Sequence, residues 1–229
     1  MPTAFPSLRA DTRSRILDAA ERLFMAHGFE ATTMRAITAE ARANLAAVTY
    51  HFGSKEQLIE EVFRRRLGVL NTRLISALDQ LEAVAGKSPV KPSRIVEAFF
   101  GEALRMAADD AHGGRTFMRL LGRTLSEPTP FVRSFLAREY AVAVARYKDA
   151  LFLALPDTPR EEIVWRLHFM LGATSHAISG ADALNLLGEG TLDNSDAEVL
   201  YRRLMSFLLG GLRAPLEDSR PAVKSRRRA

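Results

Sequence analysis

The sequence has no cysteine among its 229 residues. That absence excludes a disulfide framework, a cysteine-based zinc site and a thiol nucleophile. The sequence also lacks an apolar run near the roughly 18 residues of a membrane span, a signal-peptide pattern at its first residues, and the alternating pattern of strands. We therefore expect an all-α, cytoplasmic protein that has no membrane partner.

Motifs of enzyme chemistry are missing as well. The five histidines show no spacing that suits a metal site. The sequence contains no nucleophile elbow, no phosphate-binding loop and no His-Glu-x-x-His motif. An all-α enzyme is an alternative only if a convergent acid, base or nucleophile exists, and the sequence offers none. We therefore expect no enzymatic activity, no metal and no cofactor.

Positive charge is concentrated at one end of the chain. The net charge is +5 and the pI is about 9.9, but residues 213–229 alone carry +4. The remaining 212 residues carry only +1, so overall basicity does not indicate that the folded body binds nucleic acid. Residues 213–229 are expected to form a disordered basic tail. DNA binding has to be judged from local arrangement instead.

Helical periodicity of the apolar residues, together with capping residues, divides the chain. Residues 1–10 are expected to be a flexible arm and residues 11–53 a three-helix domain. A long helix starts at Ser54 and reaches about residue 85. Further helices are predicted over residues 93–109, 116–126, 130–155, 159–184 and 195–210. The expected N-caps of three of them are Ser93, Thr158 and Ser195. We expect residues 54–212 to form a larger helical domain for ligand binding and dimerisation.

Residues 32–58 contain the signals for two short helices and the start of the long one. Thr33 and Asn44 can cap the short helices, because a side-chain oxygen there can accept a hydrogen bond from a free backbone N–H. Ser54, with Gln57 three residues later, has the spacing of a capping box. Two short capped helices joined by a tight turn are typical of a helix-turn-helix.

The second of these short helices has an unusual outward face. Three residues are predicted to face inward: Leu45, Val48 and Phe52. Small and polar residues are predicted to face outward: Ala46, Ala47, Thr49, Tyr50 and His51. Small side chains allow a backbone to approach a flat polar surface, and Tyr and His can donate hydrogen bonds at its rim. This profile is typical of a recognition helix in the DNA major groove.

Thr33, Ile37 and the run VTYHFGSKEQL at residues 48–58 resemble the DNA-binding signature of TetR-family transcriptional regulators. The resemblance covers residues 12–60. It implies that DNA phosphates are held by Thr33, His51 and Lys55, through a helix N-terminus, an imidazole and an ammonium. The full predicted DNA-binding set is Thr33, Arg35, Asn44, Leu45, Ala46, Ala47, Thr49, Tyr50, His51 and Lys55.

Two positions depart from the family pattern. Many members have Gly where this chain has Arg42, so the resemblance does not fix the geometry of the turn. Many have Tyr where this chain has Thr49, which removes one aromatic phosphate contact that Tyr50 could partly replace. Arg35 has two interpretations, a base reader that is bidentate to guanine or a solvated charge on the helix surface.

Three further segments resemble the PsrA-type branch of the family, whose members respond to long-chain fatty acids: residues 44–48, 117–122 and 165–173. The resemblance implies an effector, a fatty acid or acyl-CoA, that lies among apolar helices. Candidate ligand-binding residues are Phe99, Leu104, Phe117, Arg119, Leu120, Leu121, Tyr140, Tyr147 and His168. Arg119, Arg123 or His168 would lie near the polar end. The alternative is that the apolar members of this set simply fill the core.

The resemblance to this family implies a DNA-binding regulator, in our interpretation a repressor that a small hydrophobic ligand releases from a palindromic operator. We expect a homodimer through the last two long helices, because two-fold symmetry presents two recognition helices to one operator. Two alternatives stay open. One is a TetR-type regulator of efflux or stress genes with an aromatic or drug-like effector, and the other is a DNA-binding protein that needs no ligand.

Overall fold

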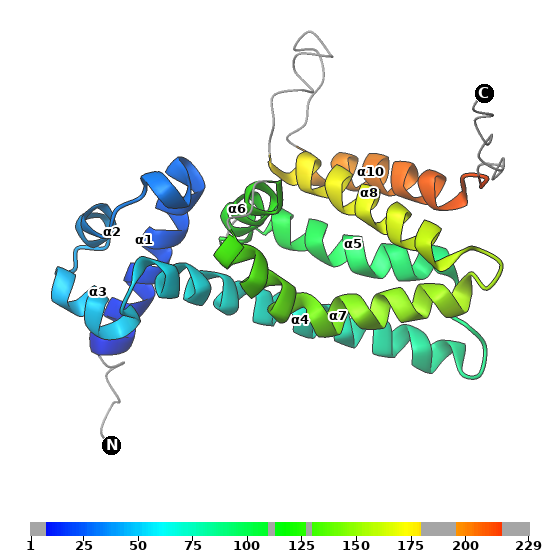
Figure 1. Ribbon diagram of the computed structural model, residues 1–229, viewed down its shortest axis with the longest axis horizontal. Coiled ribbons are helices and arrows are strands. Elements are labelled where there is room, and N and C mark those ends of the chain that lie inside the picture. Colours follow the sequence, from blue (N-terminus) through cyan, green and yellow to red (C-terminus); the bar gives the residue numbers. More distant parts are fainter. Residues whose placement is uncertain (1–7, 110–112, 127–129, 180–195, 217–229) are drawn as a thin grey trace, which may run out of the picture.

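The computed structural model describes residues 8–109, 113–126, 130–179 and 196–216, which form nine helices and no strand. Three helices lie at one end of the molecule, namely α1 (Leu8–Ala31), α2 (Met34–Glu40) and α3 (Leu45–Phe52). The long helix α4 (Lys55–Ala85) leaves this end and runs beneath the larger helical body (Figure 1). The predicted all-α class and the two-part architecture are confirmed. Among these described residues, no helix is long and apolar enough to cross a membrane.

Helix α1 starts earlier than the sequence predicts. It begins at Leu8, so residues 8–10 are helical and the predicted arm is wrong for them, while residues 1–7 lie outside the described part. The helix breaks at Gly28, where φ is 80°, a backbone conformation that glycine adopts without steric cost. Ile16, Phe24, Ile37 and Val48 are fully buried, and they form the small core that holds α1, α2 and α3 against the start of α4.

Helix α4 begins with the predicted capping box. The Ser54 hydroxyl oxygen accepts from the Gln57 backbone N–H at 3.2 Å, and the Gln57 side-chain oxygen accepts from the Ser54 backbone N–H at 3.1 Å. With 31 residues at 1.5 Å each, α4 is on the order of 45 Å long. Its buried face continues from Leu58 in the small core to Leu78 in the larger body, so one rigid element is shared by both parts.

The larger body consists of α5 (Pro92–Ala108), α6 (Gly114–Ser126), α7 (Pro130–Ala154), α8 (Arg160–Ser179) and α10 (Ala197–Arg213). Helix α5 packs against α4 and α6, and α7 lies along α4. Helices α8 and α10 lie side by side and form an outer layer (Figure 1). At the end of this layer the Arg166 guanidinium donates to the backbone oxygens of Leu212, in the last turn of α10, and of its C-cap residue Ala214.

Helix α6 begins at Gly114, two residues earlier than predicted, and the starts of α5, α8 and α10 also differ from the prediction. Helix α5 has Lys91 as N-cap and Pro92 at its first position, with no side-chain cap from Ser93, because Pro has the helical φ and lacks the N–H that would need a partner. Helix α8 begins at Arg160, one residue later than predicted. Helix α10 is capped by Asp196, whose carboxylate accepts from the Glu198 and Val199 N–H groups. The predicted cap Ser195 and the predicted end of α8 at residues 180–184 lie outside the described residues.

The two parts of the molecule meet where α1, α4 and α6 come together. The Phe63 ring of α4 lies 6.0 Å from the Phe117 ring of α6 and 6.3 Å from the Phe135 ring of α7. Beside them the Glu21 carboxylate of α1 is buried and accepts from Arg65 at 2.6 Å and from Arg66 at 3.2 Å. This junction ties the small domain to the body through packed rings and a shared carboxylate.

Candidate functional site

The two caps of the helix-turn-helix form as predicted. The Thr33 hydroxyl oxygen accepts from the Ala36 N–H at 3.1 Å, and the Asn44 side-chain oxygen accepts from the Ala47 N–H at 2.6 Å. Each cap satisfies one backbone N–H, and the other N–H groups in the first turns of α2 and α3 have no partner inside their helices. Such N–H groups, together with the helix dipole, suit a phosphate oxygen.

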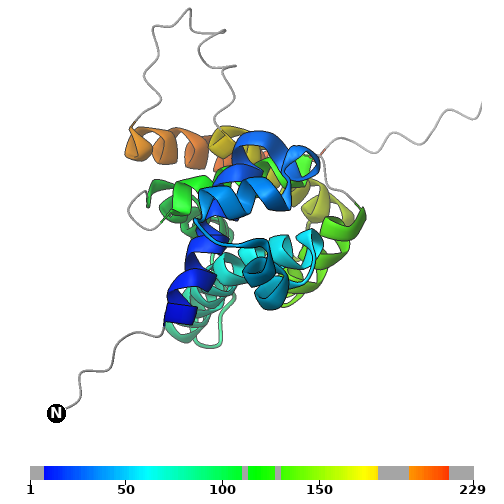
Figure 2. The same cartoon turned by 90° about the vertical axis from the view of Figure 1, so that its left-hand side faces the viewer.

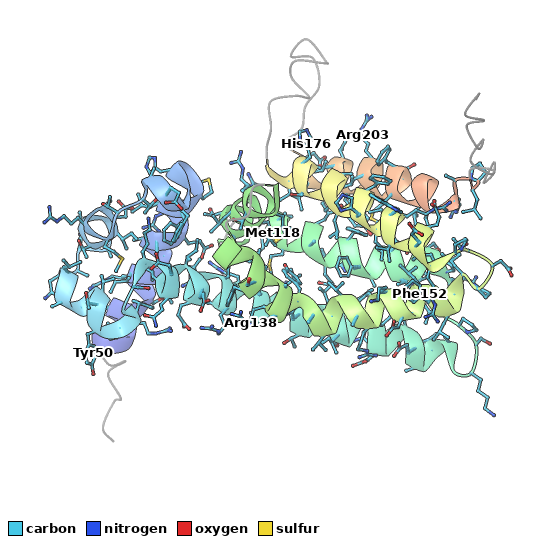
Figure 3. All side chains as sticks on the ribbon, viewed as in Figure 1. Tyr50, Met118, Arg138, Phe152, His176 and Arg203 are labelled. Carbon is cyan, nitrogen blue, oxygen red and sulfur yellow. The ribbon has the colours of Figure 1, made fainter. Side chains whose placement is uncertain are left out.

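The outer face of α3 is formed by small and polar side chains. Val48 and Phe52 are buried, as predicted, while Tyr50 is 76% exposed. Tyr50 projects from the outer edge of the molecule (Figure 3), and α2 and α3 face the viewer when the molecule is seen from this end (Figure 2). Leu45 was expected to face inward, but it is 47% exposed, because it occupies the first position of α3, where no neighbouring helix covers it. It therefore lies on the same surface as the predicted DNA contacts.

All ten predicted DNA-binding residues are accessible on α2, α3, their N-caps and the start of α4. Ala47, His51 and Lys55 are partly exposed, and the other seven, including Arg35, are exposed. The Tyr50 and His51 rings lie 5.2 Å apart, edge to face. The Thr49 hydroxyl donates to the Leu45 carbonyl at 3.1 Å, so the hydroxyl proton already has an acceptor within α3. The exposed face of α3 thus combines small, uncharged residues with the polar groups of Tyr50 and His51.

Arg42 lies at the turn between α2 and α3 and has φ of 49°. This left-handed conformation suits glycine and is strained for a residue with a side chain. The turn nevertheless closes, with the Arg42 N–H donating to Ala39 O at 3.2 Å and the Ala43 N–H to Thr38 O at 3.0 Å. The turn geometry that Gly would favour is therefore kept, and Arg42 bears the strain.

Lys55 has partners that the sequence did not indicate. Its ammonium lies 2.9 Å from Phe29 O, 3.2 Å from Thr32 O and 3.4 Å from Glu30 O, and 4.3 Å from the centre of the Phe29 ring. All three N–H donors of the ammonium have acceptors at the end of α1, where backbone carbonyls lack helical partners. The structure therefore gives Lys55 a role in holding α4 to α1. Its predicted phosphate contact would require these bonds to change.

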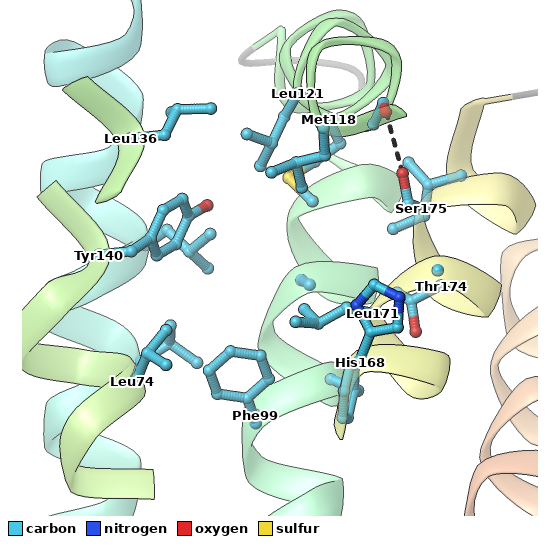
Figure 4. A pocket seen from close by; sticks show the side chains of 18 of the residues that line it. Leu74, Phe99, Met118, Leu121, Leu136, Tyr140, His168, Leu171, Thr174 and Ser175 are labelled. Atoms are coloured by element: carbon cyan, nitrogen blue, oxygen red, sulfur yellow. Dashed lines mark hydrogen bonds between the residues drawn. The ribbon is translucent and has the colours of Figure 1, made fainter. Parts of the chain in front are cut away.

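The larger body contains a cavity of about 440 Å³ between α4, α5, α6, α7 and α8. Its lining residues are Leu70, Leu74, Phe99, Phe100, Ala103, Met118, Leu121, Gly122, Leu125, Leu136, Ala137, Tyr140, Val144, His168, Leu171, Gly172, Thr174, Ser175 and Ile178. Figure 4 shows that α7 and α4 form one wall and α8 the opposite wall. A cavity of this size and apolar character is typical of a small-molecule site.

The cavity includes four of the nine predicted ligand residues, namely Phe99, Leu121, Tyr140 and His168. Burial raises the pKa of the Tyr140 phenol, so its hydroxyl stays neutral. The exposed lining residues include Ala137 and Val144 of α7 and His168 and Leu171 of α8. We therefore place the opening between α7 and α8, with His168 at its edge.

The other predicted ligand residues, Leu104, Phe117, Arg119, Leu120 and Tyr147, do not line this cavity. Phe117 packs on Phe63 at the junction. The Tyr147 hydroxyl donates to Leu74 O at 2.8 Å, and burial raises its pKa. Leu104 and Leu120 are buried elsewhere in the core and Arg119 is half-buried outside the lining. The apolar and aromatic residues of this group are placed as the core-packing alternative describes, and the side chain of Arg123 lies outside the described residues.

Several cavity residues were missed, and two of them, Thr174 and Ser175, are polar. Leu70 and Leu74 of α4, Met118 of α6 and Leu136 of α7 gave no signal beyond ordinary helical periodicity. Thr174 is 5% exposed, and its hydroxyl oxygen has no hydrogen-bond partner. The neighbouring Ser175 hydroxyl donates to Gly122 O at 3.0 Å (Figure 4). The presence of Thr174 among apolar residues of α8 could have indicated a polar group in the cavity. Among the described side chains, no group of three or more His, Asp or Glu could hold a metal ion.

Comparison with known families decides what kind of protein this is. Residues 97–211 match the model of the tetracyclin repressor-like C-terminal domain, and residues 16–62 match the model of bacterial regulatory proteins of the tetR family. The chain belongs to the TetR family. TetR-family proteins are transcriptional regulators and not enzymes, which agrees with the expectation from the sequence. The two matched regions correspond to the helix-turn-helix end and to the body that contains the cavity.

Curated TetR-family relatives match the chain over about a third of its length. The HTH-type transcriptional repressor KstR2 of Mycolicibacterium smegmatis is 39% identical over 74 residues, which cover 32% of this chain and 36% of that protein. The HTH-type transcriptional repressor Rv3405c of Mycobacterium tuberculosis is 40% identical over 70 residues, 31% of this chain and 37% of that protein. The match thus spans little more than a third of each relative.

Solved TetR-like structures share the fold over nearly the whole chain. The fatty acid degradation regulator FadR of Bacillus halodurans has a TM-score of 0.60 at 15% identity, covering 93% of this chain and 100% of that one. The ketosteroid transcriptional regulator KstR2 of Mycobacterium tuberculosis has a TM-score of 0.60 at 18% identity, covering 87% and 93%. At these identities the likeness concerns the fold alone.

Proposed function

We propose that this protein is a homodimeric repressor that binds a palindromic DNA operator and is released from it by a small hydrophobic ligand. The observation that carries the proposal is the pairing of an exposed, capped α3 with an apolar cavity, joined by one continuous helix, α4. Two α3 helices related by a two-fold axis would enter successive major grooves roughly 34 Å apart.

The dimer interface is proposed on α8 and α10. This outer layer exposes large apolar side chains: Phe169 is 65% exposed and Phe207 is 69% exposed, and the Trp165 and Phe169 rings stack 5.7 Å apart. Aromatic residues exposed in a patch are typical of a protein interface. We expect Phe169→Glu to shift the sedimentation of the protein from dimer to monomer. Leu153→Glu, on an equally exposed residue of α7 (70%), is the matched control and leaves the dimer intact.

The proposed mechanism is a shift between two populations. A ligand between α4 and α7 on one side and α8 on the other would favour a different position of α4, and α4 carries α3 with it. A ligand that binds the released state about 100-fold more tightly contributes roughly 3 kcal/mol against DNA binding. This coupling is sufficient to release the protein from an operator that is only moderately occupied.

The effector is proposed to be predominantly apolar. The cavity lining suits an acyl chain, and the names of two structural neighbours, a fatty acid degradation regulator and a ketosteroid regulator, also suggest apolar effectors. A long-chain fatty acid or acyl-CoA is one candidate, although the described lining residues include no Lys or Arg for a head group. A drug-like aromatic effector is a second candidate, favoured by the Phe99, Phe100 and Tyr140 rings in the lining.

Selection of binding sites from a random DNA pool, followed by gel-shift titration, tests the DNA-binding part. The expected result is an inverted repeat, bound more tightly than random DNA at physiological salt. Tyr50→Ala should weaken operator binding, whereas Val84→Ala, at an exposed position of α4 far from α3, should not. Binding without sequence preference would contradict the proposal. Titration of the complex with palmitate and palmitoyl-CoA tests the fatty-acid candidate.

A further inference from the structure

The cavity is almost free of charge. Of the described residues that line it, His168 and Tyr140 are the only ionisable ones, and none is Lys, Arg, Asp or Glu. His168 is exposed at the edge of the opening, and the raised pKa of Tyr140 keeps its phenol neutral. An ionised carboxylate or phosphate placed deep in such a cavity would lose its hydration without gaining a partner of opposite charge, which is strongly unfavourable.

The α8 wall of the cavity nevertheless contains a buried polar group that needs a partner. A Thr in a helix normally donates its hydroxyl proton to the carbonyl four residues earlier. Thr49, Thr72 and Thr124 all do so in this protein, at 3.1, 2.8 and 2.7 Å. Thr174 does not, and its oxygen is buried with no hydrogen-bond partner. A buried hydroxyl without a partner costs free energy that a matching ligand atom recovers.

We propose that the cavity binds an uncharged, largely apolar molecule that has a single hydroxyl or carbonyl oxygen, and that this oxygen forms a hydrogen bond with the Thr174 hydroxyl. This inference rests on the proposed function only in that it takes the cavity as the effector site. The apolar part of the molecule lies against Phe99, Leu74 and Leu136. The Tyr140 hydroxyl, which extends into the cavity from the opposite wall (Figure 4), provides a second neutral hydrogen-bonding group.

The charge of the ligand can be tested with two matched pairs of probes. 1-Dodecanol and dodecanoate differ at one end of a linear chain, and 5α-androstan-3β-ol, a steroid with a single hydroxyl, and its 3-sulfate differ at one end of a rigid ring system. Isothermal titration calorimetry of the full chain without DNA measures each affinity. At least one neutral member should bind about tenfold or more tightly than its charged counterpart.

The role of Thr174 is tested with Thr174→Val, which replaces the hydroxyl by a methyl group of similar size. In the free protein this change removes an unpartnered buried hydroxyl, so the melting temperature should stay the same or rise. Affinity for the neutral probe should fall about fivefold, as expected for one lost hydrogen bond. Thr124→Val is the matched control, because that hydroxyl bonds within α6 and lies outside the cavity; it should leave the affinity unchanged.

Three results would overturn the inference: tighter or equal binding of the charged member in both pairs, no binding of either neutral probe, or an unchanged neutral-probe affinity in Thr174→Val. None of these measurements involves DNA. A failure of the repressor proposal would instead appear as the absence of sequence-specific DNA binding, so the two outcomes are distinguishable.

Discussion

The tip of the molecule at α2 and α3 and the cavity between α7 and α8 differ in how their polar groups are satisfied. At the tip, the Lys55 ammonium has three carbonyl partners, and the oxygens of Thr33 and Asn44 each accept from a backbone N–H. In the cavity, the Thr174 hydroxyl has no partner and about 440 Å³ is not filled by side chains. Both regions are helical and both contain a well-packed apolar side.

This difference indicates what each region is suited for. A surface whose side chains are already fixed by internal hydrogen bonds loses little conformational entropy when it binds a rigid partner such as a DNA groove. A cavity with an unpartnered hydroxyl and unfilled volume is less stable alone, and it gains most when another molecule fills it. Four substitutions test this comparison, in order of decreasing effect on stability.

The largest effect is expected from Phe117→Ala. Phe117 is fully buried and packs on Phe63, so its loss leaves a hole in a tight core and should lower the free energy of unfolding by about 4 kcal/mol. Phe99→Ala is the comparison, because Phe99 already borders the cavity and should cost about 2 kcal/mol or less. Urea unfolding measures both. Equal losses would mean that the cavity wall is packed as tightly as the junction.

Lys55→Met should lower the free energy of unfolding by about 2 kcal/mol, because it removes charge-assisted hydrogen bonds to carbonyls that then lack partners. Lys87→Met, in the exposed loop after α4, is the control and should change little. The salt dependence of operator binding separates this role from a phosphate contact. If Lys55 stays on the carbonyls in the complex, the slope of log K against log salt is unchanged in the variant; a phosphate contact would reduce it by about 0.9.

Asn44→Ala should cost about 1 kcal/mol, the usual contribution of an N-cap. The loss is local to α3, so hydrogen exchange of the α3 amides should accelerate more than that of α5. Asn44→Asp retains an oxygen that can accept from the Ala47 N–H and should keep the protection. Uniform acceleration across the molecule would show that α3 is not an independently stabilised element.

The smallest expected effect is an increase in the free energy of unfolding. Arg42→Gly relieves the left-handed strain at φ of 49°, although glycine also makes the unfolded chain more flexible. The net change should be a stabilisation of about 0.5 kcal/mol, measured as a higher urea midpoint. Arg42→Ala keeps the strain and removes only the charge, so it should not produce the gain.

Local features of the sequence were the ones that could be predicted. The caps at Thr33, Asn44 and Ser54 depend on residues within four positions, and all three form. The lining of the cavity depends on which helix covers each face, which periodicity does not reveal. Tyr140 and Tyr147 are two helical turns apart on α7, yet one extends into the cavity and the other bonds Leu74 O. The carbonyl partners of Lys55 could not be predicted for a similar reason, since they lie 23 to 26 residues away along the chain.

The attachment of Lys55 to the end of α1 has a consequence for how a signal would travel. Lys55 is the first residue of α4 and follows α3 by only two residues, Gly53 and Ser54. Because the Lys55 ammonium is bound to carbonyls at the end of α1, helices α1, α2 and α3 and the start of α4 form one rigid unit. A shift of α4 would therefore move the exposed face of α3 without changing the shape of that face. Operator choice and ligand response would then be separately adjustable in evolution, the first by residues on α3 and the second by residues around the cavity.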